Sequence, residues 1–138
     1  MIKPTARKTI LLLISDKLVR SVAQEALEAE GYCVFPVGDL VSAVDRLKTI
    51  RPHLLIASHH LSSMTGHDAA RHLRARCPQM RVLISSCLLD DDRLEHRAAL
   101  EGFEVFPKPC SASDFLAKVR AILNASEAEP GRSAVAMG

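Results

Sequence analysis

Short aliphatic runs alternate with amphipathic segments along most of this chain, and this alternation limits the possible folds more than any other feature of the sequence. Each run has the length of a strand. Five such segments occur in order, at residues 9–14, 32–37, 54–57, 81–85 and 103–106. Ile10–Ile14 and Leu54–Ala57 contain no polar residue, which is typical of strands buried on both faces. The alternation predicts a parallel sheet with helices on both sides.

The segments between these runs carry the signals of helices. In the first, apolar residues recur at helical spacing, at Leu18, Val19, Val22, Ala23, Ala26 and Leu27. Gly31 follows it in the position where glycine commonly ends a helix. Thr65, with Asp68 three residues on, is close to a capping box. In all we predict helices over residues 18–30, 41–47, 66–77, 91–100 and 115–123.

Length and composition fit one globular domain. The chain has 138 residues, of which 48% are hydrophobic and 25% charged. The longest apolar run, Ile10–Ile14, is too short for a membrane span or a signal peptide, so we expect a cytoplasmic protein without a membrane partner. Residues 125–138 are rich in Ala, Ser, Glu, Pro and Gly and are expected to be a flexible tail.

Charge gives no sign of a nucleic-acid partner. The net charge is +2, from 18 basic and 16 acidic side chains. Four arginines gather at Arg71, Arg74, Arg76 and Arg81, but no aromatic residue lies among them in the sequence. Proteins that read unpaired bases need such aromatics. We therefore interpret the arginines as a solvated helix face.

Cysteine and histidine spacing gives no metal motif. The four cysteines are far apart, with no CxxC, and none of the six histidines belongs to an HExxH. The neighbours His59 and His60 have no cysteine or carboxylate at ligand spacing. No metal site is expected.

Four segments in register resemble the receiver domain of bacterial two-component response regulators. Leu18–Tyr32 resembles that family's first helix and its exit, and Arg51–Ser58 resembles the run into its phosphorylated aspartate. Leu61–Gly66 resembles the loop that follows, and Lys108–Pro109 resembles its Lys-Pro. The resemblance covers roughly residues 8–124, so residues 1–124 are expected to form one receiver-like domain. It implies a flavodoxin-like (βα)5 sandwich whose five-stranded parallel sheet has the order 2-1-3-4-5.

The same resemblance shows where this sequence departs from the family. Ser58 stands where the family has its phosphoacceptor aspartate. Ile14 and Ser15 stand where it has two acids that hold Mg²⁺, and Asp16 falls one place later. These three residues would be a degenerate acidic pocket.

Other family positions are kept or shifted. Ser85 matches the Ser or Thr that ends the fourth strand, and Lys108 with Pro109 matches the Lys-Pro. Val105 stands at the aromatic switch position, with Phe106 next to it. The implied switch residues are therefore Ser85, Val105 and Phe106.

The departures affect the expected chemistry. Mg²⁺ prefers carboxylate and water oxygens in octahedral geometry, which Ile14, Ser15 and Ser58 do not supply. Without the metal, the charge on a transferring phosphoryl group is not neutralised. A serine hydroxyl is also a weak nucleophile unless a base activates it. We expect no Mg²⁺ site, no cofactor, no enzymatic activity and no aspartyl phosphorylation.

Three functions remain open at this point. The first is a stand-alone signalling module in a phosphorelay-type pathway that binds a histidine kinase or an output protein, or forms a homodimer, through residues 91–123. The second is a receiver phosphorylated on Ser58 or Asp16. The third is an anion-binding domain that uses Lys108, Ser58 and Ser85.

Overall fold

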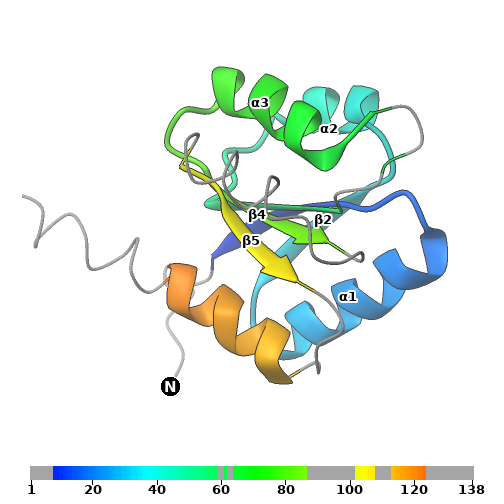
Figure 1. Cartoon of the computed structure of the whole chain (residues 1–138), viewed down its shortest axis with the longest axis vertical. Coiled ribbons are helices and arrows are strands. Elements are labelled where there is room, and N and C mark those ends of the chain that lie inside the picture. The colour runs from blue at the N-terminus through cyan, green and yellow to red at the C-terminus, as the bar shows by residue number, and fades with distance from the viewer. Residues whose placement is uncertain (1–7, 59–60, 62–63, 87–101, 108–112, 124–138) are drawn as a thin grey trace, which may run out of the picture.

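A five-stranded parallel sheet lies between two layers of helices (Figure 1). The computed structural model describes residues 8–58, 61, 64–86, 102–107 and 113–123. The strands are β1 (Thr9–Leu13), β2 (Cys33–Val37), β3 (Leu54–Ser58), β4 (Arg81–Ser86) and β5 (Glu104–Pro107). The helices are α1 (Lys17–Ala29), α2 (Leu40–Arg46), α3 (Gly66–Arg76) and a last helix over residues 113–123.

The strand order is β2-β1-β3-β4-β5, and every neighbouring pair is parallel. This confirms the predicted fold class and topology. In the register, Leu13 at the end of β1 pairs with Val37 of β2 and Ala57 of β3, while Ser58 pairs with Ser85 of β4. The carboxyl ends of β1, β2, β3 and β4 therefore meet at one edge of the sheet.

Two apolar cores cover the two faces of the sheet. Successive residues of a strand point to opposite faces, so Leu11 and Leu13 enter one core while Ile10 and Leu12 enter the other. The first core is closed by α2 and α3, and the second by α1 and the helix at 113–123. All four of these β1 side chains have 0% exposure. The prediction from the apolar run at 10–14, a strand buried on both faces, is confirmed by β1.

Side-chain caps begin three of the helices. Asp16, Asp39 and Thr65 each accept a hydrogen bond from the backbone N–H three residues on, at 2.8–3.1 Å. For Thr65 the donor is Asp68, as the capping pattern predicted. Gly31 ends α1 with a φ of +98°, a conformation that glycine adopts without a steric penalty.

Only part of the apolar surface of α1 faces the sheet. Leu27 is buried in the second core, but Leu18 is 73% exposed and Val22 is 60% exposed. At about 100° per residue, Leu18 lies about 180° around the helix from Leu27, and Val22 about 140°. The six apolar positions therefore spread over about half of the helix circumference, and only those nearest Leu27, such as Ala23, pack against the second core.

Some predictions fall outside the described residues. They are the helix at 91–100, the tail at 125–138, the histidines at 59–60, and Lys108 with Pro109. None of the helices that the structure describes combines the length and apolar character needed to cross a bilayer.

His53 joins three strands at the opposite edge of the sheet and gives a testable pH dependence. The ring Nδ1 of His53 accepts the backbone N–H of Thr9 at 3.0 Å. The backbone N–H of His53 donates to the Thr9 carbonyl, and the backbone carbonyl of His53 accepts the Arg81 N–H. Partial burial of the ring lowers the pKa of His53, and the charge of Lys8 lowers it further. Protonation would also remove the Nδ1 acceptor.

Because the folded-state pKa is lowered, the unfolded chain binds the proton more readily. The contribution of His53 to stability is then complete above about pH 6.5 and is lost as the pH falls from there through the folded pKa. We expect His53→Asn, whose Oδ1 can accept the Thr9 N–H, to lose less stability between pH 7.5 and 5.5 than the wild type. Urea denaturation at both pH values measures this, and equal losses in the two proteins would contradict it.

Candidate functional site

The carboxyl edge of the sheet is where an open parallel α/β fold places its site. Two of the predicted residues are neighbours there. Ser58 ends β3, half-buried, and pairs in the register with Ser85 of β4, which is buried with 7% exposure. The structure therefore brings these two hydroxyl-bearing residues together as the resemblance implied.

The first residue of the β1–α1 loop, Ile14, packs in the apolar core. Ile14 is 7% exposed and belongs to the core beneath α1 and the helix at 113–123. Its backbone N–H donates to the carbonyl of Val37 at 3.1 Å, which extends the contact between β1 and β2. A side chain at this position that packs against aliphatic neighbours supplies no ligand to the edge of the sheet.

Arg20 binds the backbone of the same loop. Its Nη1 donates to the carbonyl of Ile14 at 2.6 Å and contacts the carbonyl of Ser15 at 3.3 Å. Ser15 in turn directs its hydroxyl to the carbonyl of Gly38, with 3.4 Å between the oxygens. These bonds link the β1–α1 loop to the loop after β2.

Gly38 permits this arrangement because it has no Cβ. A Cβ at position 38 would lie 3.0 Å from Nη1 of Arg20. The sequence patterns did not predict this side-chain role of Arg20. The signal that could have found it is an arginine seven residues after a strand, together with a glycine directly after the neighbouring strand.

The carboxylates of Asp16 and Asp39 lie at this edge, and each caps a helix. Asp16 Oδ1 accepts the Val19 N–H at 3.0 Å, and Asp39 Oδ1 accepts the Ser42 N–H at 2.8 Å. The backbone N–H and the hydroxyl of Ser42 lower the pKa of Asp39, and Arg20 lowers it further. Asp16 is exposed and directed to its own helix.

The donor set does not fit Mg²⁺. Ile14 is packed in the core, Ser15 is bonded to Gly38, and Asp16 caps α1. Mg²⁺ is usually held by at least one carboxylate together with water. Across the described ranges, no three His, Cys, Asp or Glu side chains are grouped closely enough to hold a metal ion. The expectation of no metal stays a prediction.

The remaining predicted residues are placed only in part. Val105 and Phe106 lie in β5, where their backbones pair with Ile84 and Ser85. Lys108 and Pro109 follow β5 and are not among the described residues. Their predicted roles stay predictions.

Comparison with known sequences gives one family. The family model described as "Response regulator receiver domain" matches residues 10–120. "Response regulator MprA" of Mycobacterium avium (strain 104) is 28% identical over 130 residues, which are 93% of this chain and 56% of the relative. The protein of the same name from Mycobacterium leprae (strain TN) is 27% identical over the same shares. The chain thus spans just over half the length of these relatives.

Comparison with solved structures gives the same fold. The signal receiver domain of a putative Luxo repressor protein from Vibrio parahaemolyticus superposes with a TM-score of 0.80 at 21% identity, covering 90% of this chain and 95% of that one. A CheY-like response regulator receiver domain protein from Methanospirillum hungatei JF-1 gives 0.81 at 20% identity, with 90% and 99% covered. At these identities the likeness concerns the fold alone.

The contact between Arg20 and Gly38 gives a prediction for a double-mutant cycle. Gly38→Ala would bring its Cβ against the bound guanidinium, so we expect it to destabilise the wild type by about 1 kcal/mol. In an Arg20→Met background the guanidinium is absent. There the alanine should be neutral or stabilising, because it restricts the unfolded chain. Urea denaturation of the four proteins gives the coupling energy, expected at about 1 kcal/mol. A coupling of zero would show that Arg20 does not hold this loop.

Proposed function

The chain belongs to the response regulator receiver domain family, and on this premise we propose that it is a signalling module that acts by binding a partner protein without forming an aspartyl phosphate. Receiver domains serve two-component systems, in which they interact with histidine kinases or output proteins. The proposal concerns how this particular chain carries a signal, and what it binds.

The observation that carries the proposal is a serine, Ser58, at the end of β3, next to a β1–α1 loop whose one acidic residue, Asp16, caps α1. Ile14 faces the core, and Asp16 caps α1. A neutral hydroxyl is a weak nucleophile without a base to accept its proton. Metal ions neutralise charge as a phosphoryl group is transferred, and the described residues of this loop supply no carboxylate ligand for one. These features support a receiver fold without the aspartyl phosphorylation reaction.

The same geometry bears on the alternatives of phosphorylation at Asp16 or Ser58 and of anion binding. Phosphorylation of Asp16 would disrupt the cap of α1, because the Oδ1 that accepts the Val19 N–H belongs to the carboxyl that would be modified. Phosphorylation of Ser58 and an anion held by Lys108, Ser58 and Ser85 stay hypotheses. The homodimer, the cytoplasmic location and the absence of nucleic-acid and membrane partners also stay predictions.

An exposed apolar surface on α1 supports the proposal of a protein partner. Leu18, Val19 and Val22 form an apolar patch on its outer side, with exposures of 73%, 43% and 60%. We call these three residues the α1 patch. Three side chains cover less than the roughly 800 Å² that each partner contributes to a standard interface, so they would be the centre of a larger contact. The docking region expected from the sequence, residues 91–123, is described only at 102–107 and 113–123.

The missing reaction gives a restoration prediction. We expect neither the wild type nor Ser58→Asp to gain a phosphoryl group from acetyl phosphate and Mg²⁺, because the metal ligands are lacking in both. Adding Ser15→Asp supplies a carboxylate in the half-buried loop position next to Gly38. The variant with both Ser15→Asp and Ser58→Asp should then reach a phosphoryl occupancy at least about tenfold above the background signal of Ser58→Asp, since metal coordination contributes several kcal/mol to transfer.

Intact mass measures the occupancy, and thermal unfolding checks that each variant is folded. Asp16→Asn is the matched control, because it removes the nearby acid that caps α1 and leaves Ser58 in place. Phosphorylation of the wild type, lost in Asp16→Asn or in Ser58→Ala, would show that an alternative is right. Equal occupancy in Ser58→Asp and the double variant would show that the metal argument is wrong.

The α1 patch gives a prediction for partner binding. Val22→Ser should weaken binding to a partner found by pull-down with the full chain and then purified, by about five- to tenfold in Kd, as for a contributing interface residue. Its stability should change by less than about 0.5 kcal/mol, because Val22 is on the surface. Val41→Ser is the matched control, since Val41 is 79% exposed on α2 at the other face of the sheet. Equal affinity of the two variants would remove α1 from the interface.

A further inference from the structure

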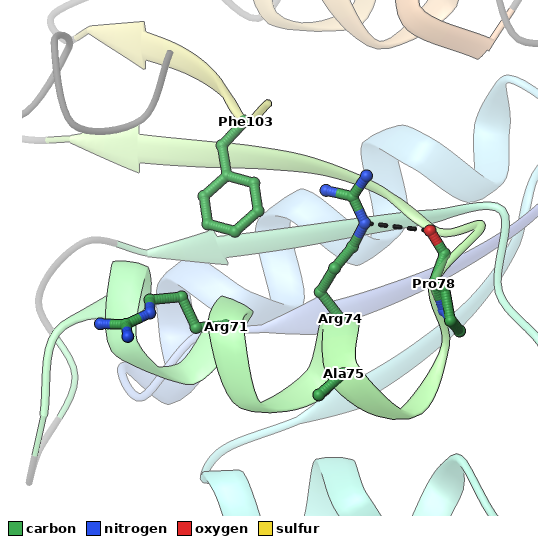
Figure 2. A pocket seen from close by; sticks show the side chains of 5 residues that line it. All are labelled: Arg71, Arg74, Ala75, Pro78 and Phe103. Atoms are coloured by element: carbon green, nitrogen blue, oxygen red, sulfur yellow. Dashed lines mark hydrogen bonds between the residues drawn. The ribbon is translucent and has the colours of Figure 1, made fainter. Parts of the chain in front are cut away.

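A hollow of about 450 Å³ lies beside α3 and is not part of the site at the carboxyl edge of the sheet. Figure 2 shows Arg74 of α3 beside Phe103, with Arg71 one turn away along the same helix. The lining residues are Arg71, Arg74, Ala75, Pro78 and Phe103. We call this hollow the α3 groove. It combines two guanidinium groups with an apolar wall.

The guanidinium of Arg74 is held in place on two sides. Its Nε donates to the carbonyl of Pro78 at 3.1 Å, and its Cζ lies 5.8 Å from the centre of the Phe103 ring. That ring is itself fixed: Phe103 is only 7% exposed and makes an edge contact with the buried ring of His67 at 5.3 Å. A guanidinium oriented in this way loses less conformational entropy when it binds a ligand.

Among the described residues that line the groove are two arginines and no carboxylate. No carboxylate of the described chain forms an ion pair with Arg74. Arg71 lies 3.9 Å from Asp68, but both side chains are about half exposed, so solvent weakens this pair. Asp68 is the only acidic residue of α3, against three arginines and His72. A second hollow of about 450 Å³ shares Arg71 and Ala75 with the first and is also lined by Met64, Asp68 and His72. The acidic residue therefore lies on the side away from Arg74.

We propose that the α3 groove binds an acidic segment of a partner protein, with a glutamate or aspartate side chain pairing with Arg74. Guanidinium groups pair with carboxylates through parallel N–H donors. The apolar wall formed by Ala75, Pro78 and Phe103 suits the methylene groups of such a side chain. Bases of a nucleic acid would need an aromatic face to stack on, but the ring of Phe103 is buried against Arg74 and His67. The geometry therefore favours a protein carboxylate.

This inference does not rest on the proposed function. The helices that carry them, α3 and α1, lie over opposite faces of the sheet (Figure 1), so the α3 groove and the α1 patch are separate surfaces. Binding in the groove also requires neither the presence nor the absence of phosphorylation at Ser58. Each surface can thus be changed without the other.

The test is an NMR titration of the full chain with a hexaglutamate peptide, followed through backbone amides and the Arg Nε–H signals. We expect saturable shifts centred on Arg74, Ala75 and Phe103. Arg74→Gln should weaken binding by about five- to tenfold, as loss of a charge-assisted contact does. Arg71→Gln, at the more exposed side of the groove, should weaken it by a smaller factor.

Arg46→Gln is the matched control. The Cζ of Arg46, on α2, lies 5.4 Å from the centre of the Phe35 ring of β2, so it has the same kind of ring contact outside the groove. This variant should bind hexaglutamate as the wild type does, and a Val22→Ser protein should too. Hexalysine and inorganic phosphate should cause no saturable shifts at Arg74.

Several results would overturn the proposal. Equal weakening by Arg74→Gln and Arg46→Gln would show a general charge effect. Tighter binding of an oligo-dT strand than of hexaglutamate at the same salt concentration would point to nucleic acid instead. If Arg74→Gln proves unfolded by urea denaturation, Arg71→Gln alone decides, and unchanged binding in that variant would exclude the groove.

Discussion

The pairing of β1 with strands on both of its sides is the interaction on which the rest of this molecule depends. Its backbone bonds to β2 and β3, and its side chains alternate into two cores. A strand in this position must be apolar throughout, because polar side chains buried without partners are costly. The parallel arrangement then brings the ends of the neighbouring strands to one edge. Every loop that could carry chemistry starts at that edge.

At that edge, the side chains of the β1–α1 loop serve structure. Ile14 extends the core, Asp16 caps α1, and Arg20 bonds the loop carbonyls beside Gly38. A pair of acids in this loop would repel one another and need a cation. Here a guanidinium bonded to backbone carbonyls stabilises the loop from within the chain. The same geometry supports a module whose signal depends on surfaces more than on a reaction at Ser58.

Those surfaces lie on two helices with different chemistry. The α1 patch is apolar, and the α3 groove combines guanidinium groups with an apolar wall. They cover opposite faces of the sheet, so one partner could not readily reach both through a small contact.

Much of this molecule was determined by local patterns in its sequence. The aliphatic runs, the cap at Thr65 and the glycine at Gly31 depend on neighbours a few residues away, and each was predicted at its place. The nearness of Ser58 to Ser85 followed from the topology. The tertiary structure decided what depends on contacts between distant segments. It determined which apolar residues of α1 face the sheet, which carbonyls the guanidinium of Arg20 bonds, and which ring lies beside Arg74. The four arginines had no aromatic residue near them in the sequence, yet β5 follows Phe103 and pairs with β4, which places that ring against α3. Sequence spacing reports neighbours along the chain, whereas a packed core also brings together residues that the chain itself keeps far apart.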